Sequence, residues 1–187
     1  MMEPPSDADI LSQYRAGDRA GALKALVETH GKAVYNIALF TLNDEVLAED
    51  ATQDAFIRIY RGLEKYQGRS SLSTWMYRIV KNVCYDQFKR RRTLPLDLED
   101  QAALMDTHNP NPEEQSLAGF RHSRVRRAVN RLPQGQRLAV TLHYFQDQSY
   151  EEIAAIMGQP LNTIKSYLHR AKAALASSLK DVEGSLT

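Results

Sequence analysis

The spacing of apolar residues is the feature that most constrains how this chain can fold. They recur at steps of three and four residues almost throughout the 187-residue sequence, whereas alternating strand-like stretches and Asn-Gly hairpin signals are missing. The spacing therefore predicts a fold of the all-α class. The expected helices of the N-terminal half cover residues 7–15, 20–29 and 32–41, a fourth follows Asn43-Asp44, and a long fifth begins near Leu72 and places Trp75 in the core.

Charge is distributed unevenly along the chain, although the formal net charge is only +1. The stretch from Thr93 to Phe120 contains six acidic residues, three prolines and no Lys or Arg, and the sequence on both sides of it is basic. Prolines and polar runs of this kind are typical of linkers. We therefore expect two small helical domains, residues 1–92 and residues 115–187, joined by a flexible acidic linker over residues 93–114.

The second domain is expected to contain a helix-turn-helix motif. A helix up to Leu132 and another from Gln136 to Phe145 precede it. Ser149 and Glu152 then have the spacing of a capping box, and apolar residues follow them at helical intervals. The next residues are typical of a tight turn between helices, because glycine tolerates the positive φ just past a helix end and proline prevents its continuation. These turn residues are Gly158 and Pro160, and we expect Asn162 or Thr163 to cap the second helix of the motif.

The second helix of this motif presents a polar and basic face. Its cations and hydrogen-bond donors suit phosphate contacts and base edges in the major groove. The alternative is a solvated helical hairpin with an ordinary basic face. The turn, the cap and the basic stripe together favour binding of duplex DNA. The residues assigned to this face are Thr163, Lys165, Ser166, His169, Arg170 and Lys172.

The long helix of the first domain carries a second polar surface, opposite its apolar stripe. Aromatic rings and cations are interleaved there and in the turn before the helix. This combination suits single-stranded DNA, because bases stack on rings while cations follow the backbone. An ordinary solvated basic face is the alternative, and spacing alone leaves both open. The candidate residues are Tyr66, Gln67, Arg69, Arg78, Lys81, Asn82, Tyr85 and Lys89.

Composition argues against several other kinds of protein. Cys84 is the single cysteine and the five histidines are scattered, so we predict no disulfide, no metal and no cofactor. No nucleophile–base pair, phosphate loop or carboxylate pair stands out, so we expect no enzymatic activity. The acidic N-terminus lacks a signal-peptide core, and no apolar run approaches the roughly 20 residues of a membrane span. We therefore expect a cytoplasmic protein without membrane insertion.

Motifs in the two halves together resemble the extracytoplasmic-function sigma factors, which keep sigma regions 2 and 4. The resemblance covers nearly the whole chain, and the order and separation of the motifs make it specific. The stretches that match region 2 are Asp50–Ile57, Tyr66–Ser70, Thr74–Ile79 and Asn82. The stretches that match region 4 are Leu132-Pro133, Ser149–Ala154, Thr163–Ser166 and Arg170-Ala171.

The resemblance implies a sigma factor that binds RNA polymerase core through its β′ and β subunits and directs initiation at specific promoters. It implies that the long-helix surface captures the melted −10 element and that the helix-turn-helix reads the −35 element of promoter DNA. It also implies control by an anti-sigma factor in a stress or envelope response. The implied docking site for the β′ coiled coil lies on the fourth helix, at Asp50, Gln53, Asp54, Ile57, Arg58 and Arg61.

Two other functions stay open on the residues alone. A stand-alone helix-turn-helix regulator would bind DNA without polymerase, and a purely protein-binding adaptor would not need its basic helix face. By periodicity, the mixed-charge face of the fourth helix is most often solvated surface, and protein docking is the minority interpretation. Binding to polymerase through this face distinguishes the sigma factor from the stand-alone regulator. Loss of promoter binding when Lys165→Ala and Arg170→Ala are combined distinguishes it from the adaptor.

Overall fold

The computed structural model describes residues 5–93 and 117–183, and all the secondary structure it describes is helical. The expected all-α class is confirmed. The chain divides into two compact units, formed mainly by Met1–Tyr85 and by Asp86–Thr187. Apart from Thr93, the predicted linker over residues 93–114 lies outside the described residues. None of the helices within the described ranges has the length and apolar character needed to cross a membrane.

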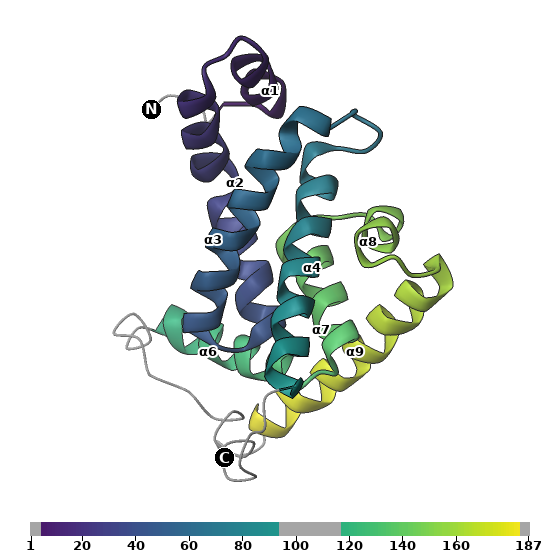
Figure 1. The fold of residues 1–187 in the computed structure, drawn as a ribbon. Helices are drawn as coiled ribbons and strands as arrows, with labels where there is room; N and C mark the ends of the chain where they lie inside the picture. The colour runs from purple at the N-terminus through teal and green to yellow at the C-terminus, as the bar shows by residue number, and fades with distance from the viewer. Residues whose placement is uncertain (1–4, 94–116, 184–187) are drawn as a thin grey trace. The chain divides into compact units, whose positions relative to one another are not determined.

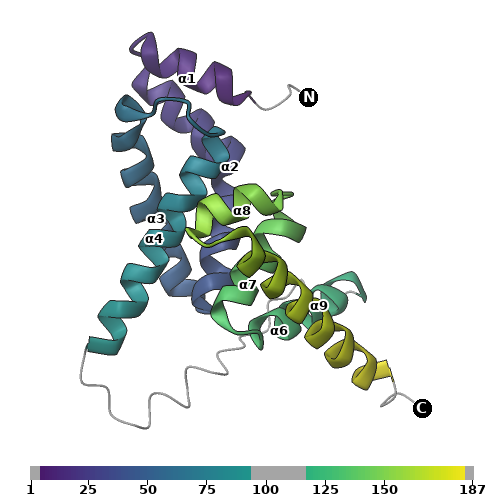
Figure 2. The same ribbon diagram turned by 90° about the vertical axis from the view of Figure 1, so that its right-hand side faces the viewer.

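The first unit is built from helices that cover one another's apolar faces. α1 lies across the end of the unit where α3 passes into η1 and the following loop (Figures 1 and 2). Ile10, Leu26, Ile59 and Met76 come from four different helices and are fully buried. The elements are α1 (Asp7–Arg15), α2 (Arg19–Leu42), α3 (Glu45–Gly62), the 3-10 helix η1 (Leu63–Lys65) and α4 (Leu72–Thr93).

α2 is one continuous helix, and the prediction of two helices over residues 20–29 and 32–41 is wrong. Glycine inside a helix costs about 1 kcal/mol relative to alanine. Burial of Leu26 and Val34 on either side of Gly31 offsets this cost. His30 adds a polar contact, because its Nε2 lies 2.8 Å from Oδ1 of Asp7 and so ties α2 to the start of α1.

Two residues join α2 to α3. Asn43 adopts left-handed backbone with φ 53°, and its N–H donates to the carbonyl oxygen of Leu39 at 2.8 Å. Asp44 caps α3, since its Oδ1 accepts a hydrogen bond from the Leu47 N–H at 3.0 Å. Asparagine tolerates left-handed backbone and aspartate is a preferred N-cap. The predicted start of the fourth helix after Asn43-Asp44 is therefore confirmed.

The second unit contains the predicted helix-turn-helix. Its elements are α6 (Leu117–Asn130), α7 (Gln134–Val140), the π-helical segment η3 (Thr141–Phe145), α8 (Tyr150–Met157) and α9 (Leu161–Glu183). α7 begins two residues before the expected Gln136, because the Arg137 N–H already donates to the carbonyl oxygen of Pro133. The buried Arg137 also donates from Nη1 to the Asn130 carbonyl oxygen at 3.1 Å, which fixes the end of α6. Its burial lowers the pKa of the guanidinium.

Candidate functional site

The candidate single-strand surface lies on α4 and on the loop before it. Arg78, Asn82 and Lys89 are exposed on α4, and Lys81 and Tyr85 are half-buried beside them. The Lys81 ammonium lies 5.7 Å from the centre of the Tyr85 ring, a cation–π contact. Burial lowers the pKa of Lys81, and the Arg78 charge lowers it further. The structure thus places the five α4 candidates along one side of the helix.

The loop before α4 has an ordered shape. The Tyr66 hydroxyl donates to the Ser70 carbonyl oxygen at 2.6 Å, and its ring centre lies 5.2 Å from that of Trp75. Gln67 and Arg69, the other two candidates of the loop, are exposed. Trp75 is half-buried, so its assignment to the core was only partly right. Its six-membered ring lies over Gly62, a contact between distant residues that helical spacing does not reveal.

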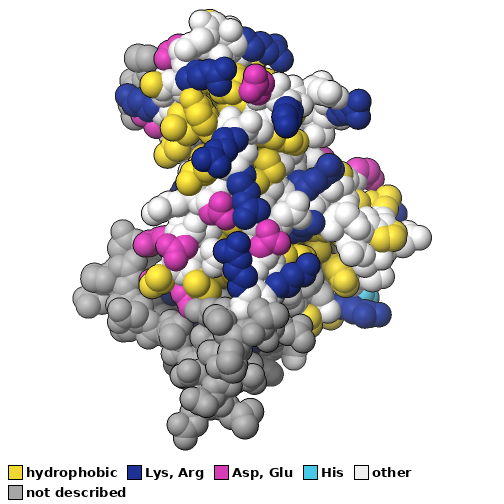
Figure 3. All heavy atoms as spheres, in the orientation of Figure 1, with side chains coloured by type: hydrophobic (Ala, Val, Ile, Leu, Met, Phe, Trp, Pro, Cys, Tyr) yellow, Lys and Arg dark blue, Asp and Glu magenta, His cyan; other side chains and the backbone are white. Residues whose placement is uncertain are grey.

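The outward face of α3 carries polar side chains with two exposed aliphatic ones among them. Val46 is 70% exposed and Ile57 is 50% exposed, and Asp50 and Gln53 lie between them at steps of four and three residues. Sequence reasoning missed Val46, although the same spacing pointed to it. Figure 3 shows basic and acidic side chains interspersed over α3 and α4 rather than collected in one patch. The face therefore combines apolar contact area with charges of both signs.

Asp54 and Arg58 form an ion pair at the edge of this face. Arg58 donates from Nε to Oδ1 of Asp54 at 3.1 Å and from Nη2 to Oδ2 at 2.9 Å. Both side chains are partly exposed, so solvent limits the stabilising energy of the pair to about 0.5 kcal/mol. Its main consequence is to hold the two side chains in a fixed arrangement. Arg61, one turn further on, is exposed.

The predicted capping box at the start of α8 is present. The Glu152 N–H donates to Oγ of Ser149 at 3.2 Å, and the Ser149 N–H donates to Oε2 of Glu152 at 2.8 Å. Gly158 has φ 66° directly after α8, as expected for the turn. The cap predicted for the next helix is wrong: α9 begins at Leu161, so Asn162-Thr163 lie within its first turn. Pro160, the residue before α9, has no N–H of its own, and its carbonyl oxygen accepts hydrogen bonds from the Thr163 and Ile164 N–H groups at 2.9 and 3.2 Å.

α9 separates a buried stripe from a polar face. Ile164, Leu168 and Ala171 are buried. The candidate duplex-reading residues Lys165, Ser166, His169, Arg170 and Lys172 are exposed, and Thr163 is half-buried. Tyr167 lies at the border of the two faces and its ring lies over Gly135 in α7, where an added Cβ would be 2.9 Å from Cε2. The structure thus places the six candidates on one helix, and this ring is one of the contacts between that helix and α7.

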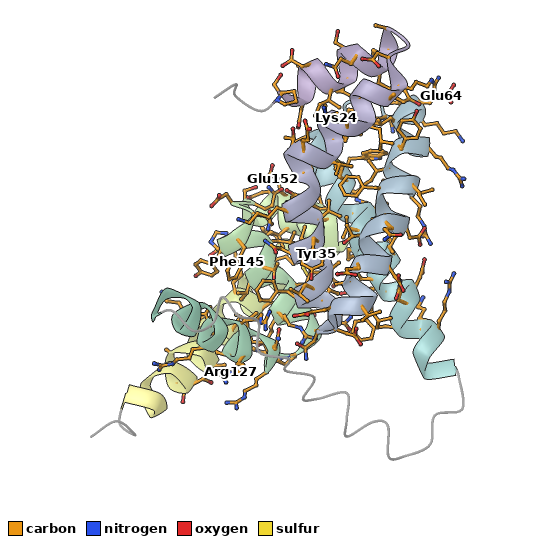
Figure 4. All side chains as sticks on the ribbon, turned by 90° about the vertical axis from the view of Figure 1, so that its left-hand side faces the viewer. Lys24, Tyr35, Glu64, Arg127, Phe145 and Glu152 are labelled. Carbon is orange, nitrogen blue, oxygen red and sulfur yellow. The ribbon has the colours of Figure 1, made fainter. Side chains whose placement is uncertain are left out.

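Two exposed aromatic residues near the motif were missed by sequence reasoning. Tyr144 is 58% exposed, and Phe145, labelled in Figure 4, ends the π-helical segment and is also exposed. The neighbouring His143 ring packs edge-on against Tyr150 at 5.0 Å, and its Nδ1 lies 3.0 Å from the Gln148 carbonyl oxygen. These contacts join η3 to the start of α8. A π-helical turn changes which side chains face outward, so the regular helical period could not indicate them.

Metal and thiol chemistry have little support in the described part of the chain. Within residues 5–93 and 117–183, no three His, Cys, Asp or Glu side chains are placed to hold a metal ion. Cys84 is fully buried, and burial raises the pKa of its thiol to about 12. The thiol is therefore protonated at neutral pH, whereas reaction requires the thiolate.

Comparisons with known proteins match both units. The family model for sigma-70 region 2 matches residues 26–93, which include most of α2, all of α3 and α4. The model for sigma-70 region 4 matches residues 122–175, which include the helix-turn-helix. The RNA polymerase sigma-H factor of Pseudomonas aeruginosa is 30% identical over 96% of this chain and 97% of its own length. The ECF RNA polymerase sigma factor SigM of Mycobacterium tuberculosis is 34% identical over 93% of this chain and 85% of its own length.

Solved structures show the same fold. The sigma factor RpoE of Bartonella quintana, in complex with the anti-sigma factor NepR, is 26% identical, with a TM-score of 0.71 over 84% of this chain and 96% of that one. CnrH, solved with the cytosolic domain of CnrY, is 23% identical and has a TM-score of 0.66 over 94% of this chain and 99% of its own. The motifs, the two helical units and these relatives agree: the chain belongs to the extracytoplasmic-function RNA polymerase sigma factors of the sigma-70 family.

Proposed function

We propose that this chain binds RNA polymerase core and directs it to promoters, reading the −10 element as a single strand and the −35 element as duplex DNA. In this proposal residues 1–92 bind polymerase and the −10 element, residues 93–114 form a flexible linker, and residues 115–187 bind the −35 element. The main support is that one chain matches both sigma regions and carries an exposed polar helix face in each. Two weak contacts on one chain raise each other's effective concentration.

The polymerase-binding surface is the outward face of α3. Protein interfaces are built from an apolar centre that excludes water and a polar rim that sets partner and orientation. Val46 and Ile57 supply exposed apolar area on this face. The proposed contact residues are Val46 together with Asp50, Gln53, Asp54, Ile57, Arg58 and Arg61.

The −10 surface is formed by α4 and the loop before it. Exposed cations on α4 follow the phosphates of one strand, and the loop receives unstacked bases. The proposed residues are Tyr66, Gln67, Arg69, Arg78, Lys81, Asn82, Tyr85 and Lys89. Holding one strand after it has separated converts binding energy into stabilisation of the open promoter.

The −35 surface is the polar face of α9. Lys165, Arg170 and Lys172 supply phosphate contacts, and Ser166 and His169 supply donors and acceptors for base edges. Thr163 lies in the first turn of α9, where recognition helices approach the bases of the major groove. The chemistry of RNA synthesis belongs to polymerase, so the chain itself is not an enzyme and acts in the cytoplasm, where polymerase and promoter are found.

Control by an anti-sigma factor is also part of the proposal. The related RpoE was solved with such a partner. A protein that covers the α3 face would prevent polymerase binding in unstressed cells. Affinity purification of the chain from its native cells is expected to recover this protein, and the loss of its binding when Ile57 is replaced by Glu would locate it on α3.

The decisive experiment combines binding and transcription. Purified chain is mixed with core polymerase from the same organism, passed over a size-exclusion column, and used to select promoters from a library of randomised duplexes. We expect co-elution and new transcription from the selected duplexes, which core alone does not start. Co-elution without transcription, or DNA selection that is equally effective without polymerase, contradicts the proposal, and the second result favours a stand-alone regulator.

A charge reversal on α3 tests the docking surface. Asp54→Arg breaks the ion pair with Arg58 and reverses one charge of the face, so we expect loss of co-elution with core. Glu28→Arg is the matched control, because it makes the same charge change on an exposed residue of α2 in the same unit. Core binding by Asp54→Arg at wild-type strength would place the docking surface elsewhere.

A further inference from the structure

The aromatic residues at the loop before α4 have a role distinct from contact with DNA. We infer that Tyr66 and Trp75 are positioning residues: they fix the shape of the loop Gln67–Ser70, and this loop, rather than the Tyr66 ring, meets the unpaired −10 strand. The inference rests on the proposed function, because it divides the work among residues of the −10 surface.

Gly62 at the end of α3 forms the base of this arrangement. A Cβ added there would lie 2.9 Å from Cζ2 and 3.1 Å from Cη2 of Trp75. The absence of a side chain at this position therefore lets the indole lie directly on the helix backbone. Trp75 is held at this place although it is only half-buried.

Tyr66 connects this ring to both ends of the loop. Its ring centre lies 5.2 Å from that of Trp75, with the planes inclined by 49°. Its N–H donates to the Leu63 carbonyl oxygen at 3.1 Å, and its hydroxyl donates to the Ser70 carbonyl oxygen at 2.6 Å. The second bond spans the loop and fixes the separation of its ends. Burial and the charge of Asp7 raise the pKa of Tyr66, so the hydroxyl keeps its proton at neutral pH.

The far end of the loop is fixed by the start of α4. The Thr74 N–H donates to Oγ of Ser71 at 3.1 Å, and Ser71 Oγ donates to Oγ1 of Thr74 at 2.8 Å. Ser71 therefore caps α4 directly after the loop. The Tyr66 hydroxyl thus joins the first residue before the loop to its last residue, Ser70, and α4 begins directly after its cap, Ser71.

This geometry determines which groups are presented to a strand. One side of the Tyr66 ring packs near Trp75 and its hydroxyl bonds the Ser70 carbonyl oxygen, so at most one face of the ring is available for stacking. Gln67 and Arg69 are exposed on the closed loop, on either side of Gly68 with φ 68°. An amide and a guanidinium can contact base edges or phosphates when their backbone is held in place.

Tyr66→Phe separates the two roles, because it removes the hydroxyl and keeps the ring. The probe is the labelled non-template strand of a promoter selected by the wild-type holoenzyme. We expect its affinity for the variant holoenzyme to fall several-fold, while affinity for core and for the −35 duplex stays unchanged. Tyr35→Phe on α2 removes a hydroxyl from another half-buried tyrosine of the same unit and should leave strand affinity unaltered. Full strand affinity in Tyr66→Phe would overturn the inference in favour of stacking.

Gly62→Ala gives a second, independent test through Trp75. The new Cβ should displace the indole, shift the emission of the chain's single tryptophan and weaken strand binding. Phenylalanine lacks the ring atoms that meet this Cβ, so Trp75→Phe added to Gly62→Ala should restore part of the strand affinity. If the double variant keeps its helical content but regains no strand affinity, the proposed packing of Trp75 on Gly62 is contradicted.

Failure of the inference can be told apart from failure of the proposed function. If wild-type holoenzyme does not bind the selected strand, the −10 assignment is wrong and the inference falls with it. If the wild type binds and Tyr66→Phe binds equally, only the positioning role is wrong.

Discussion

Both units place an aromatic ring against a glycine, but the two contacts control different things. In the first unit Trp75 lies over Gly62 beside a loop, and in the second Tyr167 of α9 lies over Gly135 of α7. The first ring shapes a loop that follows a helix, whereas the second is one of the contacts that place the reading helix itself. A strand whose bases are unstacked suits a loop of fixed shape that presents polar side chains, while duplex DNA suits a helix that fits the major groove.

The largest expected effect is on the rate at which a thiol reagent modifies Cys84. Cys84 is the only thiol of the chain, so this rate reports on the first unit alone. With a pKa of about 12 the thiolate fraction at pH 8 is on the order of 10⁻⁴. We expect a thiol reagent to react at least about a thousandfold more slowly with folded than with denatured protein. Gly135→Ala should leave this rate unchanged. Faster labelling in that variant would show that the units do not open independently.

The same thiol predicts a pH dependence for the first unit alone. Its folded pKa lies above the value of about 8.5 for an unfolded cysteine. Its contribution to stability is therefore complete below pH 8.5 and is lost as the pH rises towards 12. Cys84→Ala should reduce the loss of stability over this range, as measured by urea unfolding followed through Trp75 emission.

Removing two cations from α9 should affect duplex binding strongly. Lys165→Ala together with Arg170→Ala removes two charge-assisted contacts, which we expect to weaken −35 duplex binding by about 3 kcal/mol, on the order of a hundredfold. The salt dependence of binding should fall by a slope of about 2. Core binding and −10 strand binding should be unaltered. Duplex binding at wild-type strength would exclude α9 as the reading helix.

Gly135→Ala tests the placement of α9 without touching its exposed residues. The added methyl collides with the Tyr167 ring, and overpacking of this kind costs about 1–3 kcal/mol. We expect about a tenfold loss of −35 affinity and partial recovery when Tyr167→Leu is added. The comparison with Gly62→Ala is direct, because that variant should weaken strand binding and spare the duplex. Equal loss of both activities in either variant would remove the proposed division of labour.

The smallest effect is expected at the cap of α8. Ser149→Ala removes one side of the capping box and should destabilise the second unit by about 1 kcal/mol. Faster hydrogen exchange in α8 and the turn after it, with α2 and α3 unchanged, is the expected result. Ser149→Asp keeps an acceptor for the N–H groups and serves as the control. Exchange rates in Ser149→Ala equal to wild type would show that the Glu152 side of the box suffices.

Local chemistry made much of the fold predictable. The Asn43-Asp44 joint, the capping box and the turn at Gly158 depend on residues a few positions apart. The continuous α2 was missed because burial on both sides of Gly31 outweighs its local preference. The helix-terminal capping rule also failed at Asn162-Thr163, because α9 already begins at Leu161, directly after Pro160.

The candidate site likewise has parts that the sequence indicated and parts that it did not. Helical spacing placed the polar faces of α3, α4 and α9, since every residue of a face follows from its period. The two glycine–aromatic contacts join residues far apart in sequence, and nothing in their local pattern indicates them. The exposed rings of Tyr144 and Phe145 were missed because the π-helical turn departs from that period.

The joint between α2 and α3 has a consequence for how such chains change in length over evolution. Asn43 and Asp44 each complete a different helix end, so an inserted residue would separate a cap from its helix, and a deletion would remove one. Insertions should be selected against here, and for the same reason at the Gly17-Asp18 turn, where Asp18 caps α2 by accepting a hydrogen bond from the Gly21 N–H at 2.9 Å. Alignment gaps among relatives, or a systematic scan of single-residue insertions, would then show which helix junctions of the domain tolerate a change in length.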